Sequence, residues 1–254
     1  MSRIDKAGIA DEARDRTNRA FAAKLRDFGK RLGLRLVVGL TAAAAALFLF
    51  ARLASETLEG DTRQFDDWSR SAIHQFASPA LTSVMRVVTA LGTPSLLFGL
   101  SLITAIAFAI AKRYRAMMLF IATMVGATIL DQVLKLSFHR ARPEPFFDIL
   151  SPSSFSFPSG HALASFCFYS AVAVLISRRT SYRLVRVVTW TIAVLLVLLI
   201  GLSRIYLGVH YATDVLAGYS AAFIWVMIIA AGDRTFRRKA SAEDHLAEPE
   251  RRTR

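Results

Sequence analysis

The sequence predicts an all-α, polytopic membrane protein whose six transmembrane helices form one bundle. Hydrophobic residues make up 54% of the 254 residues, although 20% of the residues are charged. The two classes are segregated into apolar runs and basic links, which is typical of membrane proteins and not of soluble domains. The basic charge is also distributed unequally between alternate links, as expected when positive charge sets membrane orientation.

Six uncharged runs define the expected spans. They cover residues 36–51, 94–111, 116–130, 162–176, 187–202 and 215–232. Several are shorter than the roughly 20 residues that cross a bilayer, so each is expected to include a turn of flanking chain. The chain is therefore divided into a basic segment (1–35), a six-span membrane domain (36–232) and a disordered tail (233–254).

The distribution of the +13 formal charge sets the expected orientation. With both termini in the cytoplasm, most of the 32 Lys and Arg residues fall in cytoplasmic segments, and the opposite orientation would reverse this preference. Membrane orientation thus explains the basic balance, and no nucleic-acid partner is expected. We expect an integral protein of a bacterial inner membrane that contacts the lipid bilayer. The sequence leaves its oligomeric state open.

Two long segments lie outside the spans. Residues 1–31 carry apolar side chains at helical spacing opposite basic ones, which fits either a helix on the membrane surface or a solvated tail. Residues 53–92 form the longest external segment, expected as a helix along the outer interface near the substrate entrance. No role for either segment follows from the sequence.

The third run ends in ionisable residues. Asp131 and Lys135 lie at its outer end, where charged side chains are costly and usually functional. Their spacing of four predicts an ion pair on one helix face. Arg142 and Pro143 follow in a loop, residues 138–158, that contains four prolines and is therefore expected to form a rigid lid.

The fourth run begins directly after Pro158, Ser159, Gly160 and His161. Backbone N–H groups at a helix start bind anions, and glycine lets the backbone approach a ligand closely. His161 is expected on the first helical turn, pointing at the bound group.

The link between the fifth and sixth runs contains Arg204, His210 and Asp214. His210 and Asp214 are four residues apart, so a helical conformation would place them on one face. A carboxylate there holds an imidazole in one tautomer and leaves its other nitrogen available for attack or proton transfer. Arg204 adds a permanent cation whose fork suits phosphate oxygens.

Topology brings these three blocks to one face of the membrane. Lys135 ends an outward span, His161 begins an inward one, and Arg204 and Asp214 flank the next external turn. Three cations, two histidines and one carboxylate suit a phosphoryl group, and the blocks contain no cluster of acids or thiolates that would bind a metal. We therefore expect the active site at the external, periplasmic face.

The three blocks together resemble the signature of the type 2 phosphatidic acid phosphatase (PAP2) superfamily. They read Lys135-x6-Arg142-Pro143, Pro158-Ser159-Gly160-His161 and Ser203-Arg204-x5-His210-x3-Asp214. Every signature position is present in order, and the combined pattern is far more specific than any one block. The superfamily also includes vanadium haloperoxidases and bacterial class A acid phosphatases, but the six spans favour its integral membrane lipid phosphatase branch.

The resemblance implies catalytic roles for His210, His161 and Asp214. His210 would attack phosphorus and form a phosphohistidine while Asp214 orients its ring. His161 would protonate the leaving oxygen and then activate the hydrolytic water. The substrate phosphate would be bound by Lys135, Arg142, Ser159, Gly160 and Arg204. Neither a metal nor another cofactor is expected, because these cations neutralise the phosphate charge.

The expected activity is metal-independent hydrolysis of a membrane lipid phosphomonoester or diphosphate. Candidate substrates are undecaprenyl pyrophosphate, phosphatidylglycerol phosphate, phosphatidic acid and the phosphates of lipid A. One alternative is a lipid phosphotransferase that uses the same phosphohistidine with a hydroxyl acceptor. A more remote alternative is a non-hydrolytic lipid-phosphate transporter, which the sequence disfavours because it shows no internal repeat.

Three polar residues beside the motifs have open interpretations. His139 and Arg140 either rim the pocket or face water. Ser203 either positions Arg204 or only caps the helix.

Overall fold

The computed structural model describes residues 37–147 and 153–252, and of residues 238–252 it describes the backbone alone. The predicted basic segment, residues 1–35, therefore lies outside the described residues. The chain divides into two compact units after Ala45. Residues 46–254 form one unit that holds every predicted site residue.

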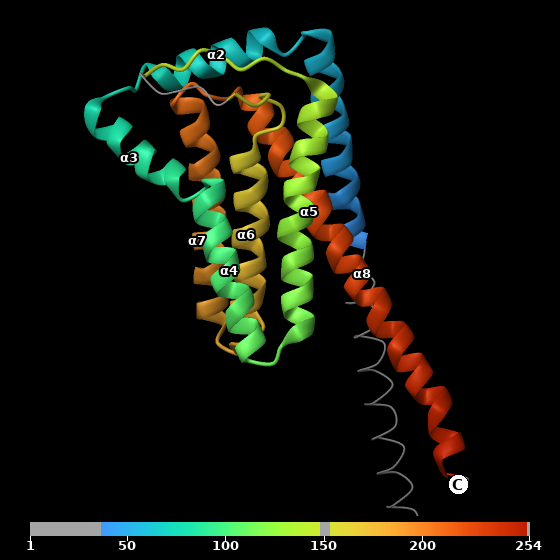
Figure 1. Cartoon of the computed structure of the whole chain (residues 1–254). Helices are drawn as coiled ribbons and strands as arrows, with labels where there is room; N and C mark the ends of the chain where they lie inside the picture. Colours follow the sequence, from blue (N-terminus) through green and yellow to red (C-terminus); the bar gives the residue numbers. More distant parts are fainter. Residues whose placement is uncertain (1–36, 148–152, 253–254) are drawn as a thin grey trace, which may run out of the picture. The chain divides into compact units, whose positions relative to one another are not determined.

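The described residues are helical and contain no β-strand, which confirms the all-α prediction. The helices are Val37–Glu59, α2 (Arg63–His74), α3 (Pro79–Ala90), α4 (Pro94–Ile110), α5 (Tyr114–Phe138), α6 (Gly160–Ser177), α7 (Arg183–Tyr206) and α8 (Ala212–Arg252) (Figure 1).

Five of these helices are long and apolar enough to cross a membrane. They are Val37–Glu59, α5, α6, α7 and the part of α8 at Ala212–Arg237. The pair formed by α3 and α4 passes the same test together but bends by 43° between its two helices. The described part of the chain thus has five candidate spans, or six if the bent pair counts as one.

The segment expected along the outer interface contains two helices, α2 and α3. A cap defines the start of α3: the Ser78 hydroxyl accepts a hydrogen bond from the Leu81 N–H at 3.3 Å, and Pro79 occupies the first helical position. Pro94 likewise occupies the first helical position of α4, although the Thr93 side chain makes no capping hydrogen bond there. Prolines suit these positions because the first helical N–H groups have no partner within the helix.

The last helix is longer than the sequence predicts. α8 extends to Arg252, whereas the composition predicts a disordered tail from residue 233. Ala, Glu, Arg and Lys dominate this stretch, and these residues are strong helix formers even where they bury nothing.

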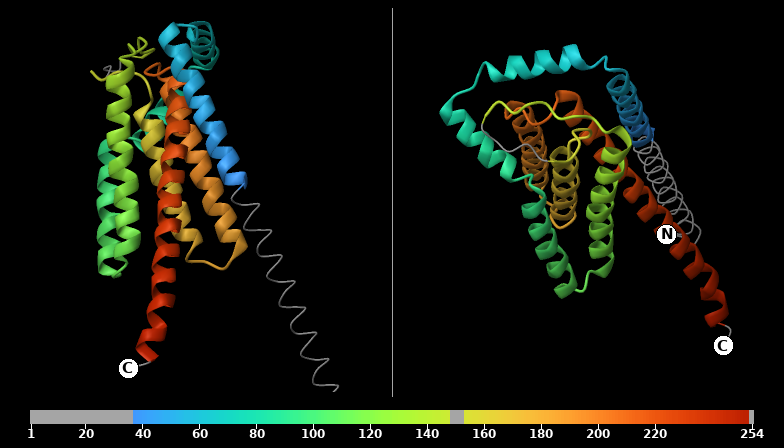
Figure 2. Two further views of the ribbon diagram at one scale, coloured as in Figure 1. Left: turned by 90° about the vertical axis from the view of Figure 1, so that its right-hand side faces the viewer. Right: turned by 45° about the horizontal axis from the view of Figure 1, so that its top comes forward.

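α6 is the central helix of the unit. It contacts α4, α5, α7 and α8, and Figures 1 and 2 show it between α5 and α7. Its Leu163 and Cys167 are fully buried. A small residue lets α8 approach the start of α6 closely, since a Cβ on Gly218 of α8 would lie 3.1 Å from the Ala162 Cβ. This packing holds the first turn of α6, and with it His161, in place.

The ends of α5 and α7 and the starts of α6 and α8 lie at the same end of the unit, which we call the motif end. α2 lies across the motif end and contacts α7 and α8 (Figure 1). α3 packs on α7, where Thr82 and Tyr206 share a hydrogen bond of 2.8 Å between their hydroxyls. The segment at 53–92 therefore supplies part of the environment of the motifs.

Candidate active site

The end of α5 and the start of α6 meet at a buried ion pair. Lys135 Nζ lies 2.8 Å from Asp131 Oδ2, which confirms the pair predicted from their spacing. A Cβ added to Gly160 would lie 3.0 Å from both carboxylate oxygens of Asp131 and 3.1 Å from Lys135 Nζ. Glycine therefore lets the start of α6 approach this pair closely.

The first residues of α6 present unpartnered polar atoms. Ser159 is the N-cap residue, but its hydroxyl makes no capping hydrogen bond, while its N–H donates to the Asp214 carbonyl at 2.9 Å. His161 follows on the first turn, as predicted. Among the described residues, Ser159 Oγ and His161 Nε2 are buried and have no hydrogen-bond partner. Both atoms are therefore able to bind a polar ligand without breaking an existing contact.

Arg204 lies in the last turn of α7 and is 7% exposed. Its Nη1 donates to Thr89 Oγ1 of α3 at 2.7 Å, and its buried Nε has no partner among the described residues. It lies close enough to the rings of His161 and His210 to act on the charge of both. The Ser203 hydroxyl instead donates to the Ile200 carbonyl of its own helix.

Arg142 is held in the loop after α5 and faces His210. Its Nε donates to the Ser154 carbonyl at 2.7 Å, and its Nη1 donates to the Val209 carbonyl at 2.9 Å. The same Nη1 lies 2.9 Å from His210 Nε2. Burial lowers the pKa of Arg142, although Asp214 opposes this shift. The guanidinium thus occupies the side of the ring from which His210 would attack.

His210 and Asp214 pair, but not on one helix as predicted. α8 begins at Ala212, so His210 precedes the helix, and its Nδ1 lies 3.3 Å from Asp214 Oδ2. Asp214 is the third residue of α8, and Oδ2 also accepts the Tyr211 N–H at 2.9 Å, as in one half of a capping box. Because the carboxylate only accepts, Nδ1 carries the ring proton and Nε2 presents its lone pair to Arg142.

Burial controls the charge of His210. It lowers the pKa of His210 to about 4, although the hydrogen bond and charge of Asp214 oppose the shift. Arg142 and Arg204 also disfavour the imidazolium. The ring is therefore neutral near pH 7, which is the protonation state that a nucleophile requires.

Arg140 joins the buried carboxylates of Asp66 and Asp214. Its Nη1 lies 2.6 Å from Asp214 Oδ1, and its Nη2 lies 2.7 Å from Asp66 Oδ2. Asp66 in turn accepts from the N–H and the hydroxyl of Thr213, at 3.0 and 2.7 Å. Burial opposes the charge of Arg140, but the two carboxylates outweigh it and raise its pKa. The sequence left open whether Arg140 rims the pocket or faces water, and neither interpretation anticipates this bridge.

The sequence carried little sign of this network. Asp66 lies 74 positions before Arg140 and outside the three motifs. The local signal was only that Arg140 lies two residues before Arg142, in the proline-rich loop that carries a motif residue. His139, by contrast, is exposed and stacks edge-on against Phe155.

The structure thus brings the predicted site residues to the motif end. Hydrogen bonds connect Arg142 with His210 and Ser159 with Asp214, and Gly160 lies against Lys135. Within residues 37–147 and 153–237, whose side chains the structure describes, no group of three His, Cys, Asp or Glu side chains is arranged as a metal site. The catalytic and phosphate-binding roles of the predicted site residues stay predictions.

Comparison with known proteins places this arrangement in a family. Residues 116–238 match the model of the PAP2 superfamily. The chain is 31% identical over 199 residues to phosphatidylglycerophosphatase B of Bacillus subtilis, an alignment that covers 76% of this chain and 96% of that protein. A lipid A 1-phosphatase of Rhizobium johnstonii is 32% identical over 120 residues, which cover 43% of this chain and 44% of that protein.

A solved structure shows the same fold. The crystal structure of a transmembrane PAP2 type phosphatidylglycerolphosphate phosphatase from Bacillus subtilis superimposes with a TM-score of 0.70 at 28% identity. The match covers 76% of this chain and 96% of that chain.

The pKa of His210 predicts a pH dependence of stability. An unfolded histidine has a pKa of about 6.5, so between pH 6.5 and about 4 the unfolded chain binds a proton that the folded chain does not. Stability is therefore expected to fall as the pH falls through this window, and less steeply in His210→Gln. Thermal unfolding in detergent from pH 4 to 7 measures both slopes. His139→Gln, which removes an exposed histidine, is the control, and equal slopes in His210→Gln and the wild type would contradict the assignment.

The Arg140 bridge predicts a large loss of stability in Arg140→Gln. This variant leaves Asp66 and Asp214, both fully buried, without their counter-charge, which costs about 3–5 kcal/mol of unfolding free energy. Neutralising Asp66 as well, in Asp66→Asn/Arg140→Gln, is expected to restore part of that loss. Unfolding in mixed micelles measures the effect.

The matched control is Arg52→Gln, because Arg52 pairs with Glu56 on an exposed helix face. It is expected to cost no more than about 1 kcal/mol. Equal unfolding free energies for Arg52→Gln and Arg140→Gln would show that the Arg140 bridge does not stabilise the fold.

Proposed function

We propose that this chain, which belongs to the PAP2 superfamily as a membrane lipid phosphatase, hydrolyses a lipid phosphomonoester or diphosphate through a phosphohistidine at His210. One observation carries the mechanism: His210 is neutral, its Nδ1 faces a buried carboxylate, and its Nε2 faces a guanidinium that suits phosphate. Three residues of the motifs also have a buried polar atom without a partner among the described residues. They are Ser159, His161 and Arg204.

Before the chemical step, Arg142 exchanges its contact with His210 for one with the substrate phosphate. When a phosphate dianion binds, the guanidinium of Arg142 donates to a phosphate oxygen in place of His210 Nε2. The released lone pair attacks phosphorus in line, a P–N bond forms, and the bond from phosphorus to the lipid oxygen breaks. Asp214 stabilises the positive charge that develops on the ring.

His161 moves the protons. A bound phosphate dianion beside this ring favours a proton on it, because the opposite charges attract. His161 donates this proton to the departing lipid oxygen, which leaves as an alcohol. It then takes a proton from water, whose oxygen attacks phosphorus and releases inorganic phosphate and free His210.

The oxygens of the transferring group are held by groups from three elements. Arg142 comes from the loop after α5, Ser159 from the start of α6, and Arg204 from the end of α7. Lys135 already pairs with Asp131, so it contributes less net charge than its position in the motif suggests. Such prearranged donors stabilise charge in the transition state because they need not reorganise during the reaction.

Phosphatidylglycerol phosphate is the substrate that we place first. The relative from Bacillus subtilis that matches along 96% of its length is named a phosphatidylglycerophosphatase. Undecaprenyl pyrophosphate, phosphatidic acid and lipid A phosphates remain candidate substrates because the site described recognises the phosphoryl group and not the lipid. We further propose that the motif end faces the periplasm and both termini the cytoplasm, which the distribution of Lys and Arg supports.

Two histidine variants test the division of roles. His210→Asn is expected to abolish phosphate release and the acid-labile phosphoprotein. His161→Asn is expected to slow release from an alkyl phosphate about 10²–10⁴-fold, the usual contribution of a general acid. On an aryl phosphate analogue, whose leaving group needs no proton, His161→Asn is expected to give one rapid burst of phenol and to accumulate phosphoprotein.

The control is His139→Asn, which makes the same substitution at an exposed position. His139 has a φ of 47°, a conformation that asparagine adopts readily, so wild-type turnover is expected. A phosphoprotein that persists in His210→Asn would exclude His210 as the nucleophile. If His161→Asn slows the first step, release of the leaving group, equally on the alkyl and the aryl phosphate, His161 is not the acid.

A further inference from the structure

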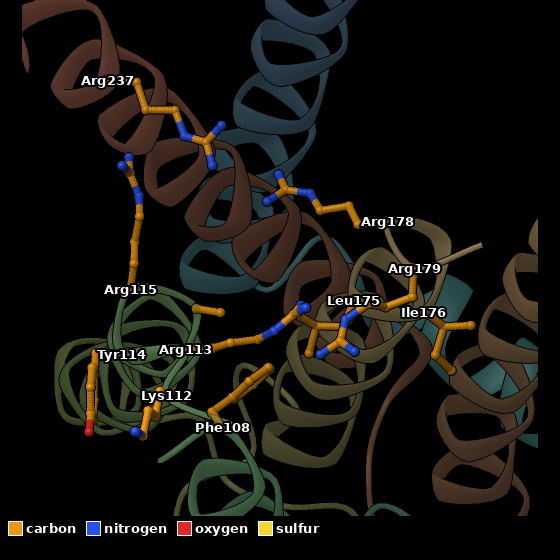
Figure 3. Close-up of a pocket in the computed structure, with 11 residues that line it drawn as sticks. Phe108, Lys112, Arg113, Tyr114, Arg115, Leu175, Ile176, Arg178, Arg179 and Arg237 are labelled. Carbon is orange, nitrogen blue, oxygen red and sulfur yellow. The ribbon is translucent and has the colours of Figure 1, made fainter. Parts of the chain in front are cut away.

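A second basic site lies at the other end of the bundle. α5 starts beside it at Tyr114 and reaches the motif end at Lys135, about 30 Å away at 1.5 Å per residue. Here a cavity of about 700 Å³ opens between the link from α4 to α5, the end of α6 and α8 (Figure 3). Its volume is in the range of small-molecule sites, roughly 300–1,000 Å³.

Six cationic side chains line this cavity. They are Lys112, Arg113, Arg115, Arg178, Arg179 and Arg237. Figure 3 shows that Arg113 and Arg179 extend toward the same space from different elements. In the described part of the chain, one carboxylate meets these cations, Asp233, at 2.7 Å from Arg115 and 3.6 Å from Arg237. The positive charge of the cavity therefore greatly exceeds its negative charge.

The backbone reinforces this preference for an anion. α5 begins at the cavity with no acidic residue in its first turn. The N-terminus of a helix carries a partial positive charge and unpaired N–H groups, which add to the attraction of the arginines.

The wall of the cavity is apolar where it enters the helical bundle. Phe108 of α4 and Leu175 and Ile176 of α6 line this part (Figure 3). Leu175 and Ile176 belong to α6, which is a candidate membrane span, so this part of the wall suits an acyl chain. A small soluble anion would use the cations but leave this wall unoccupied.

We propose that the cavity binds an anionic phospholipid, with its phosphodiester among the arginines and an acyl chain against Phe108 and Leu175. Arginine forks bind phosphate oxygens in pairs, and basic pockets between membrane helices are suited to anionic head groups. A phosphodiester such as phosphatidylglycerol is not a monoester substrate. This site goes beyond the proposed phosphatase activity and does not depend on it.

Native mass spectrometry of the full chain in neutral detergent tests this proposal. Phosphatidylglycerol, phosphatidylcholine with the same acyl chains, and glycerol phosphate are each titrated. The pocket variant is Arg113→Gln/Arg178→Gln, and its control is Arg183→Gln/Arg186→Gln, which removes two exposed arginines at the same end but outside the cavity. Each basic side chain near an anionic lipid strengthens binding about five-fold, so the pocket variant is expected to bind phosphatidylglycerol about 30-fold more weakly.

Each outcome decides the proposal. The proposal is supported if the pocket variant loses the phosphatidylglycerol molecule that binds most tightly to the wild type and the control variant keeps it. It is overturned if the two variants bind equally, if phosphatidylcholine binds as tightly, or if glycerol phosphate displaces the lipid at equal concentration. Thermal unfolding in the same detergent reports folding of each variant, and Arg179→Gln/Arg237→Gln replaces the pocket variant if that variant is unfolded.

Discussion

The buried carboxylate of Asp214 is the interaction on which the motif end depends. It is fully buried and accepts from Arg140, Ser156 and the Tyr211 N–H while it faces His210. A buried charge is stable only when such partners replace water. Arg140 and Ser156 lie in the loop between α5 and α6, whereas His210 and Tyr211 directly precede α8, so the carboxylate connects that loop to the start of α8. The orientation of the His210 ring follows from this network rather than from a helix face.

Arg140 extends the same constraint to α2. Through Asp66 it connects α2 to α8, and Asp66 also accepts from Thr213 beside Asp214. Thr89 of α3 similarly orients Arg204. Helices α2 and α3 therefore act as a frame for groups that the motifs supply. Neither helix carries a motif. A displacement of either helix is nevertheless expected to change the orientation of the Arg204 guanidinium or of the His210 imidazole, and therefore the rate of hydrolysis.

The sequence predicts what depends on local spacing or on hydrophobicity. The Asp131–Lys135 pair, the position of His161 on the first turn of α6 and the all-α class all follow from such patterns. The contacts of Asp66 and Arg140 do not, because no periodicity relates residues 74 positions apart. The pairing of His210 with Asp214 was predicted for a helix face, but the chain achieves it with a turn before α8. Spacing thus identifies which groups meet, while tertiary packing decides how they meet.

A structure of the protein with orthovanadate tests the central claim most directly, because vanadate adopts the five-coordinate geometry of phosphoryl transfer and such analogues bind tightly. The arrangement predicts vanadium bonded to His210 Nε2, with Arg142 released from that nitrogen and donating to a vanadate oxygen. Arg204 Nε and Ser159 Oγ, which lack partners among the described residues, are expected to contact the other oxygens. Vanadate bound away from His210, or bound while Arg142 still holds Nε2, would contradict the proposed mechanism.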